Sequence, residues 1–272
     1  MDNLTFASTE ADARAVAAVE EHHAAMAGAL AVQATAVADL ARAGRGDEAD
    51  RARAQLLTWC REELVPHALA EEGSLYAAAA QQPEARLLVE AMLAQHRAIV
   101  GLVDALEGAR DAVSAAVAAG ALRSLFEVHL AAENEQILPL LVAAPGVSVA
   151  DLLGDLHEMV GGPEHEHEHG HGHEHGTEAA AEAGHGACGC HEVDPAGWPE
   201  LDARLVPHKI RHATVFGALD AVAPGASLVL LAPHDPLPLL DQLQRREPDA
   251  FSVDYLDRGP ETWRLLITRT AG

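Results

Sequence analysis

Two segments with the pattern His-x-x-x-Glu constrain this chain more than any other feature. They span His67–Glu71 and His129–Glu133, and each lies in a stretch with the apolar periodicity of an α-helix. Residues four positions apart lie on the same face of a helix. That face is apolar, because it continues from Leu64 in one segment and from Leu125 in the other. Burying a carboxylate costs several kcal/mol unless it is paired or bound to a metal. Two His–Glu pairs on apolar helix faces therefore favour a metal site.

Four long stretches with helical periodicity predict an N-terminal all-α domain, an up-down-up-down four-helix bundle over residues 1–160 with a short fifth helix at 149–160. Pro66 lies inside the second stretch and is expected to kink it directly before His67. The predicted helices run from about Thr9 to Ala43, from Asp47 to Ala80, from Pro83 to Gly108, and over 122–141 with a start as early as Asp111.

Residues 161–194 have the composition of a disordered linker rich in His, Glu and Gly, with nothing apolar to bury in its first half. Imidazoles and acids in this density bind borderline divalent cations such as Zn²⁺ or Ni²⁺, and the alternative is a solvated spacer. A single Cys-x-Cys pair is a weak metal signal, since structural zinc sites use Cys-x₂-Cys. The candidate secondary ligands are His165, His167, His169, His171, His173, His175, Cys188 and Cys190.

Residues 195–272 predict a second domain, an α+β two-layer sandwich with the order βαβαββ. Its elements are strands near 201–204, 227–232, 251–256 and 262–268, with helices at 208–222 and 237–246. Asp235 is expected to be the N-cap of the second helix. His208, His212 and His234 would approach one edge of this domain, but the sequence assigns them no site. The linker predicts a loose orientation between the two domains.

The charge of the chain limits its partners. The net charge is −24, from 18 basic and 42 acidic residues, which argues against nucleic acid and anionic membranes and favours divalent metal ions. No run approaches the ~20 apolar residues of a membrane span, and the N-terminus lacks the pattern of a signal peptide. Three cysteines without a framework spacing fit a reducing compartment, so a cytoplasmic location is expected.

Every predicted helix of the bundle carries an imidazole near the middle of its apolar face. Mixed imidazole and carboxylate ligands suit iron, zinc or manganese, and the absence of thiolates favours a redox-active di-iron centre. On the first helix we choose His23 over His22, because Met26 and Leu30 continue its apolar face. His22 and His157 remain candidate extra ligands. The predicted metal ligands are His23, His67, Glu71, His96, His129 and Glu133.

These motifs resemble the hemerythrin-like, HHE cation-binding domains over roughly residues 10–160. The matching segments are Pro66–Glu72 and His129–Pro139, together with single histidines on the first and third helices. The resemblance implies a non-heme di-iron cofactor with Glu71 and Glu133 as bridging carboxylates. Oxygen-carrying hemerythrins have a further His four residues along the third helix, where this chain has Val100. The resemblance therefore implies a reactive or sensing site rather than a reversible oxygen carrier.

The C-terminal domain resembles a small α/β domain of unknown function that is often found beside hemerythrin-like or cupin domains. Its order of elements is also similar to that of the small sulfur-carrier proteins, in which a Cys-Pro pair opens the first helix. Here the corresponding residues are Val206, Pro207 and His208, without a thiol, so persulfide transfer is not expected.

We therefore predict a di-iron protein that handles or senses O₂, NO or peroxide, in stress response or iron–sulfur repair. The alternative is a protein that stores or delivers Ni, Zn or Fe through its His-rich tract. An iron-dependent oxidoreductase activity is a third option, although no catalytic acid, base or nucleophile emerges from the sequence. The protein partner of the C-terminal domain, if it has one, is not identified.

Overall fold

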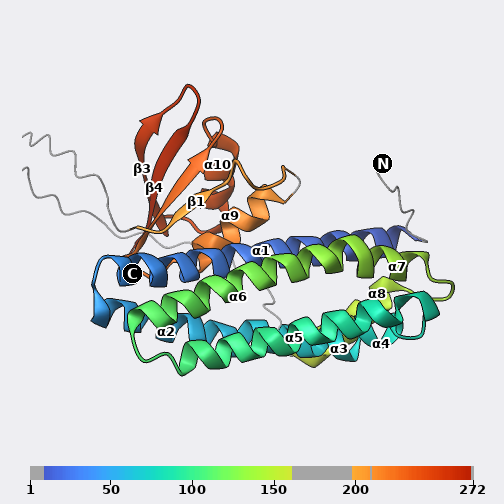
Figure 1. Ribbon diagram of the computed structural model, residues 1–272. Helices are drawn as coiled ribbons and strands as arrows, with labels where there is room; N and C mark the ends of the chain where they lie inside the picture. Colours follow the sequence, from blue (N-terminus) through green and yellow to red (C-terminus); the bar gives the residue numbers. More distant parts are fainter. Residues whose placement is uncertain (1–8, 161–197, 209, 271–272) are drawn as a thin grey trace, which may run out of the picture.

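A computed structural model describes residues 9–160, 198–208 and 210–270 of the chain. The linker predicted at 161–194 lies outside the described residues, and so do the six histidines and two cysteines predicted there as secondary ligands. Figure 1 shows an elongated helical bundle with a small sheet-containing domain packed against one side of it. The two parts correspond to the fold classes predicted from the sequence.

The N-terminal part is a bundle of four helical rods joined by short connections, as predicted. Thr9 and Asp111 cap the first and fourth rods, since their side chains accept hydrogen bonds from the N–H groups of Asp12 and Ser114. The rods are α1 (Glu10–Arg42); α2 (Gly46–Trp59), η1 (Cys60–Leu64), α3 (Val65–Gly73) and α4 (Leu75–Ala79); η2 (Pro83–Ala85) and α5 (Arg86–Glu107); and α6 (Ala112–Ala132), η3 (Glu133–Ile137) and α7 (Leu138–Ala143), followed by α8 (Val149–Val160).

Two of the rods contain a π-helical segment beside a proline, where the sequence predicted a kink at Pro66. Pro66 follows η1 and Pro139 follows η3, and each proline lacks the N–H that would bond to the carbonyl four residues earlier. Those carbonyls belong to Glu62 and Glu135, inside the two π-helical segments. The wider π turn removes the need for that hydrogen bond and gives the proline ring room. The rod thus passes each proline without ending.

The second rod is interrupted at Ser74, which the sequence prediction missed. Ser74 has φ −117° and ψ −83°, outside the helical region, and it separates α3 from α4. Its hydroxyl donates to the carbonyl of Ala70 at 2.8 Å. Gly73 and Ser74 are weak helix formers compared with the Ala-rich segments around them, which explains why the break occurs there.

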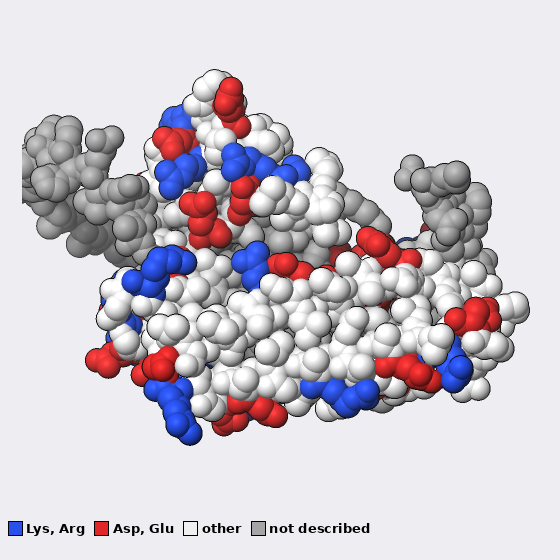
Figure 2. Space-filling view, in the orientation of Figure 1, with Lys and Arg blue, Asp and Glu red and all other residues white. Residues whose placement is uncertain are grey.

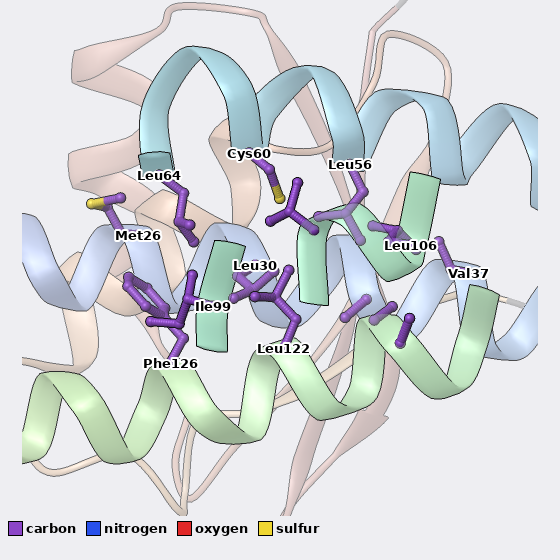
Figure 3. Packing of buried hydrophobic residues seen from close by; sticks show 14 of the residues in the cluster. Met26, Leu30, Val37, Leu56, Cys60, Leu64, Ile99, Leu106, Leu122 and Phe126 are labelled. Atoms are coloured by element: carbon purple, nitrogen blue, oxygen red, sulfur yellow. The ribbon is translucent and has the colours of Figure 1, made fainter. Parts of the chain in front are cut away.

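The apolar interior of the bundle consists of two clusters that meet near its middle. One contains Met26 and Ile99 with the residues of Figure 3, and the other contains Val19 and Met92. Cys60 belongs to the first cluster as a small buried side chain, and burial raises the pKa of its thiol to about 12. Most of the buried polar side chains of the bundle lie where these two clusters meet.

The C-terminal domain has the predicted order βαβαββ. The strands form one sheet in the order β1-β2-β4-β3, with β1 parallel to β2 and the other pairs antiparallel. Alternate residues of β2 and β4, such as Leu230 and Leu265, pack with Val215 and Leu243 from the helices on one face of the sheet. The elements are β1 (Glu200–Asp202), α9 (Arg211–Asp220), β2 (Ser227–Ala232), α10 (Leu237–Arg246), β3 (Phe251–Arg258) and β4 (Trp263–Arg269).

Asp235 does not cap α10, contrary to the prediction. The N-cap is Pro236, and this helix has no side-chain cap. The carboxylate of Asp235 instead accepts a hydrogen bond from the hydroxyl of Tyr255 at 2.8 Å. The carboxylate of Asp235 therefore accepts a hydrogen bond from β3, whereas the local sequence predicts that it accepts one from the first turn of α10.

The loose orientation expected for the two domains is wrong, because α1 and α9 pack in direct contact. A Cβ on Gly28 would lie 2.0 Å from the carbonyl oxygen of Thr214, and one on Gly217 would lie 2.0 Å from that of Ala25. Only glycine allows the two helix backbones to approach this closely. Val32 of α1 also belongs to the apolar core of the C-terminal domain. The first helix is therefore part of both domains.

The visible face of the bundle in Figure 2 is largely uncharged, with acidic and basic side chains gathered near its margins. Exposed apolar side chains on α6 include Val113, Val117 and Val128. Two helices, Glu10–Arg42 and Ala112–Ala143, are long and apolar enough to cross a membrane, judged by length and composition alone. Neither contains a continuous apolar run of that length. Half of the α1 window is buried inside the protein, and core helices of soluble proteins pass the same test.

The contact between α1 and α9 predicts opposite effects for two glycine substitutions. We expect Gly28→Ala to lower the free energy of unfolding by ~1–3 kcal/mol, because its Cβ would overlap Thr214. Gly101→Ala in α5 should instead raise it by up to ~1 kcal/mol, since a Cβ there meets nothing within 4 Å and alanine favours the helix. Urea unfolding measures both values, and equal effects would contradict the close contact.

Candidate metal centre

The six side chains predicted as ligands are brought together in the core of the bundle. His23 comes from α1, His96 from α5 and His129 from α6; the remaining three are His67 and Glu71 on α3 and Glu133 at the start of η3. All six are buried, with at most 7% of any residue exposed. His23 follows Val19 by one turn and precedes Met26, and these two residues belong to different apolar clusters. The polar group therefore fills the junction between the clusters.

The first half of the cluster contains His23, His67 and Glu71. One carboxylate oxygen of Glu71, Oε1, lies 3.1 Å from Nε2 of His23 and 2.9 Å from Nε2 of His67. The three ligand atoms lie within 4.8 Å of one another. Two ligand atoms that each lie ~2.1 Å from one ion, at tetrahedral or right angles, are roughly 3.0–3.4 Å apart. The observed spacing therefore suits a single metal ion.

The second half contains His96 and His129, again with Glu71. The two Nε2 atoms are 3.1 Å apart, and Oε2 of Glu71 lies 3.7 Å from Nε2 of His96. These three side chains form the second group with metal-ligand spacing. The hydroxyl of Tyr76 lies 3.4 Å from both imidazole nitrogens, so a buried phenol also faces this half.

Both carboxylates reach across the two halves. Glu71 directs Oε1 to His23 and His67 and Oε2 to His96. Oε2 of Glu133 lies 3.9 Å from Nε2 of His23 and 3.7 Å from Nε2 of His129. A carboxylate that faces two groups of imidazoles has the arrangement needed to bridge two ions.

Three of the four imidazoles are held through Nδ1 by side-chain oxygens. Nδ1 of His23 donates to Asn134 at 2.8 Å, that of His96 to Glu72 at 2.9 Å, and that of His129 to Gln95 at 3.0 Å. Because the proton is then on Nδ1, the lone pair of each neutral ring is on Nε2, which faces the cluster. Metal-bound histidines in proteins are oriented by such contacts.

Several polar atoms at the centre have no hydrogen-bond partner. They are Nε2 of His67, Oε2 of Glu71 and both carboxylate oxygens of Glu133. His67 Nε2 is close to Glu71 but is not aligned for a hydrogen bond. Each buried unpaired group costs ~1–3 kcal/mol, and more if it is charged. Four such atoms around one point fit a bound cation, so the residues present fit a metal centre.

Without a metal, the pKa values of the two carboxylates are shifted in opposite directions. Burial alone would raise the pKa of Glu71, but the charge of His67 and the hydrogen bond and charge of His23 outweigh it and bring the pKa well below its ordinary value. Burial and the neighbouring charge of Glu71 raise the pKa of Glu133 well above its ordinary value. Burial also lowers the pKa of His129 to about 3, with a further contribution from His96.

Burial and the charges of Glu133 and Glu71 raise the pKa of the Tyr76 phenol. Sequence reasoning did not select Tyr76 or the supporting residues Asn134 and Gln95. The available signals were weak: Tyr76 lies one helical turn after Glu72, and each of the other two adjoins a predicted ligand. Glu72, which orients a ligand through its contact with His96, likewise adjoins the predicted ligand Glu71.

The two candidate extra ligands, His22 and His157, are not part of the described cluster. His22 is exposed, and its ring packs edge-on against that of His67 at 5.0 Å between centroids, so His23 and not His22 faces the centre. His157 lies in the helical backbone of α8, but its side chain lies outside the described part of the chain.

Comparison with known proteins identifies two domains. Residues 14–141 match the family model of the Hemerythrin HHE cation binding domain, and residues 200–269 match that of an Uncharacterized conserved protein, DUF2249. The first match contains all six clustered side chains and the second contains the whole sheet. No curated protein and no solved structure matches the chain.

The raised pKa of Glu133 predicts that the metal-free protein loses stability as the pH rises above 6.5. The folded chain retains a proton on Glu133 that the unfolded carboxyl releases near its ordinary value of 4.5, so the free energy of unfolding falls as the pH rises. Between pH 6.5 and about 3, His129 has the opposite effect, because the unfolded imidazole binds a proton that the folded one does not. Above 6.5 the effect of Glu133 is no longer opposed by His129, and one retained proton gives a slope of at most ~1.4 kcal/mol per pH unit.

Urea unfolding of the metal-free protein between about pH 6.5 and 8.5 measures this slope. Glu133→Gln cannot titrate and should remove it, whereas Glu135→Gln, at an exposed position on the same π-helical segment, should keep it. Equal slopes in both variants would contradict the assignment to Glu133.

Proposed function

Because residues 14–141 belong to the hemerythrin HHE cation-binding family and residues 200–269 to DUF2249, we propose that this chain is a non-heme di-iron protein that handles or senses O₂, NO or peroxide. One observation carries the proposal: Glu71 belongs to both groups with metal-ligand spacing, and each of its oxygens faces one group. This arrangement supports two ions at adjacent positions more strongly than one.

In this proposal His23 and His67 would hold one iron, His96 and His129 would hold the other, and the two carboxylates would serve both. A di-iron pair would supply a redox change and open coordination positions for a small ligand. Six protein side chains leave such positions free, and Val100, at the place of a further histidine in the oxygen carriers, is partly exposed and carries no ligand atom.

The remaining residues have roles that follow from their contacts. Asn134, Glu72 and Gln95 fix the imidazole rings, and the apolar clusters on either side restrict water. Tyr76 keeps its proton at neutral pH, since its pKa is raised, and its hydroxyl faces the His96 half. It is therefore placed to donate a hydrogen bond to a small ligand bound there. No side chain of the cluster is proposed as a nucleophile.

Metal analysis tests the di-iron proposal. Protein purified without a nickel column should contain about two irons per chain and show an oxo-bridge absorption band. Glu71→Gln should lose both irons because it serves both halves, while Glu62→Gln, on the same rod but exposed, should lose neither. One tightly bound ion per chain, or zinc in place of iron, would contradict the proposal.

The rival function, metal storage or delivery, rests on the composition of the His-rich tract. Deletion of residues 163–176 separates the two proposals. A di-iron protein should keep its spectrum and its reaction with NO or peroxide after the deletion. Loss of cellular metal tolerance with an unchanged di-iron spectrum would favour the storage function, and steady-state turnover of hydrogen peroxide would favour an enzyme.

The role of Tyr76 can be separated from that of the residues that orient the ligands. Tyr76→Phe should keep both irons but change the rate of reaction with peroxide or NO, because it removes only a hydroxyl. Asn134→Ala should weaken iron binding by about 10–100-fold, since it releases the ring of His23. Stopped-flow spectra and competition with a chelator measure the two effects. The reverse pattern would show that the roles are misassigned.

A further inference from the structure

A small cavity in the C-terminal domain is not used by the proposed di-iron function. Its volume is about 70 Å³, far below the roughly 300–1,000 Å³ of pockets for organic ligands. It is lined by His208, Arg211, His212 and His234 together with apolar residues, and no Asp or Glu belongs to the lining that the structure describes. In a chain with a net charge of −24, this is a local excess of basic groups.

The topology of the sheet explains why these residues meet. Strands β1 and β2 are parallel, so their carboxyl ends lie at the same edge, and each leads into a helix. His208 and Arg211 follow β1, whereas His234 follows β2. In open α/β sheets, ligands bind in the crevice outside the carboxyl ends of strands. Neither α9 nor α10 has a side-chain cap, so both helices add positive potential at their N-termini.

The contacts of the basic residues leave groups available for a ligand. Arg211 is held by Nε and Nη2, which donate to the carbonyl of Val206 at 3.2 and 2.9 Å, and Nη1 has no partner among the described residues. Nδ1 of His212 contacts Gln242, and Nδ1 of His234 contacts the carbonyl of Asp235, both at 3.2 Å. Nε2 of each ring has no partner among the described residues, and it donates to an anion when the ring carries a proton on both nitrogens.

The arrangement favours an anion over a metal ion. Among the described residues, the groups with metal-ligand spacing both lie in the bundle, so these imidazoles do not meet that spacing. The guanidinium of Arg211 would also repel a cation. A tetrahedral oxyanion presents oxygens in several directions and can accept from donors too far apart to share one ion. We propose that this cavity binds a small inorganic oxyanion, of the phosphate or sulfate type.

Calorimetric titration of the full chain with inorganic phosphate at constant ionic strength tests the inference. We expect saturable binding at one site, weakened about tenfold or more in Arg211→Gln and in His234→Gln. Arg245→Gln, which alters an exposed arginine of α10 paired with Asp241, should bind as the unmodified protein does. A parallel titration with sulfate distinguishes the two anions.

Two further variants keep the result independent of the di-iron centre and of the linker. Glu71→Gln and the deletion of 163–176 should both leave phosphate binding unchanged. His234 lies in an exposed connection, so its substitution keeps the test valid if Arg211→Gln fails to fold. Absence of saturable binding, or equal binding in His234→Gln and Arg245→Gln, would overturn the proposal.

Discussion

The burial of two carboxylates in an Ala-rich core is the constraint on which the bundle depends. Glu71 and Glu133 are almost fully buried, and their unpaired oxygens would destabilise a helix packing that offered them no cation. Four imidazoles from four rods surround them. The bundle can therefore place its charges in the interior only if all four rods keep their axial positions, which links metal binding to correct assembly.

Helix α1 connects this interior to the C-terminal domain. Its inner face carries His23, whereas Gly28, little more than one turn along, contacts α9. A shift of the C-terminal domain along α1 would therefore act on the same backbone that positions one of the clustered imidazoles. The cavity lined by Arg211 and His212 lies at the start of α9, the helix that makes this contact. The two domains thus share one rigid element.

Periodicity was enough to predict the bundle, the order of the C-terminal elements and the residues that converge, because buried faces repeat every turn. His67 and Glu71 illustrate this, since a polar pair on an apolar stripe can point only inward. The contacts of Gly28 with Thr214 and of Gly217 with Ala25 could not be predicted in this way, because they join residues far apart in the sequence. Asn134 was also missed, since the direction of its side chain depends on how the rods rotate about one another.

Each π-helical segment contains one residue more than an α-helical turn of similar length requires. If the same five residues, Cys60–Leu64, formed a regular α-helix instead, everything that follows would be rotated by about 100°. His67 and Glu71 would then leave the core together. The wide turn therefore sets the angular phase of a whole rod, so a further residue inserted there would move the clustered side chains, whereas one inserted in the loop after α5 would not.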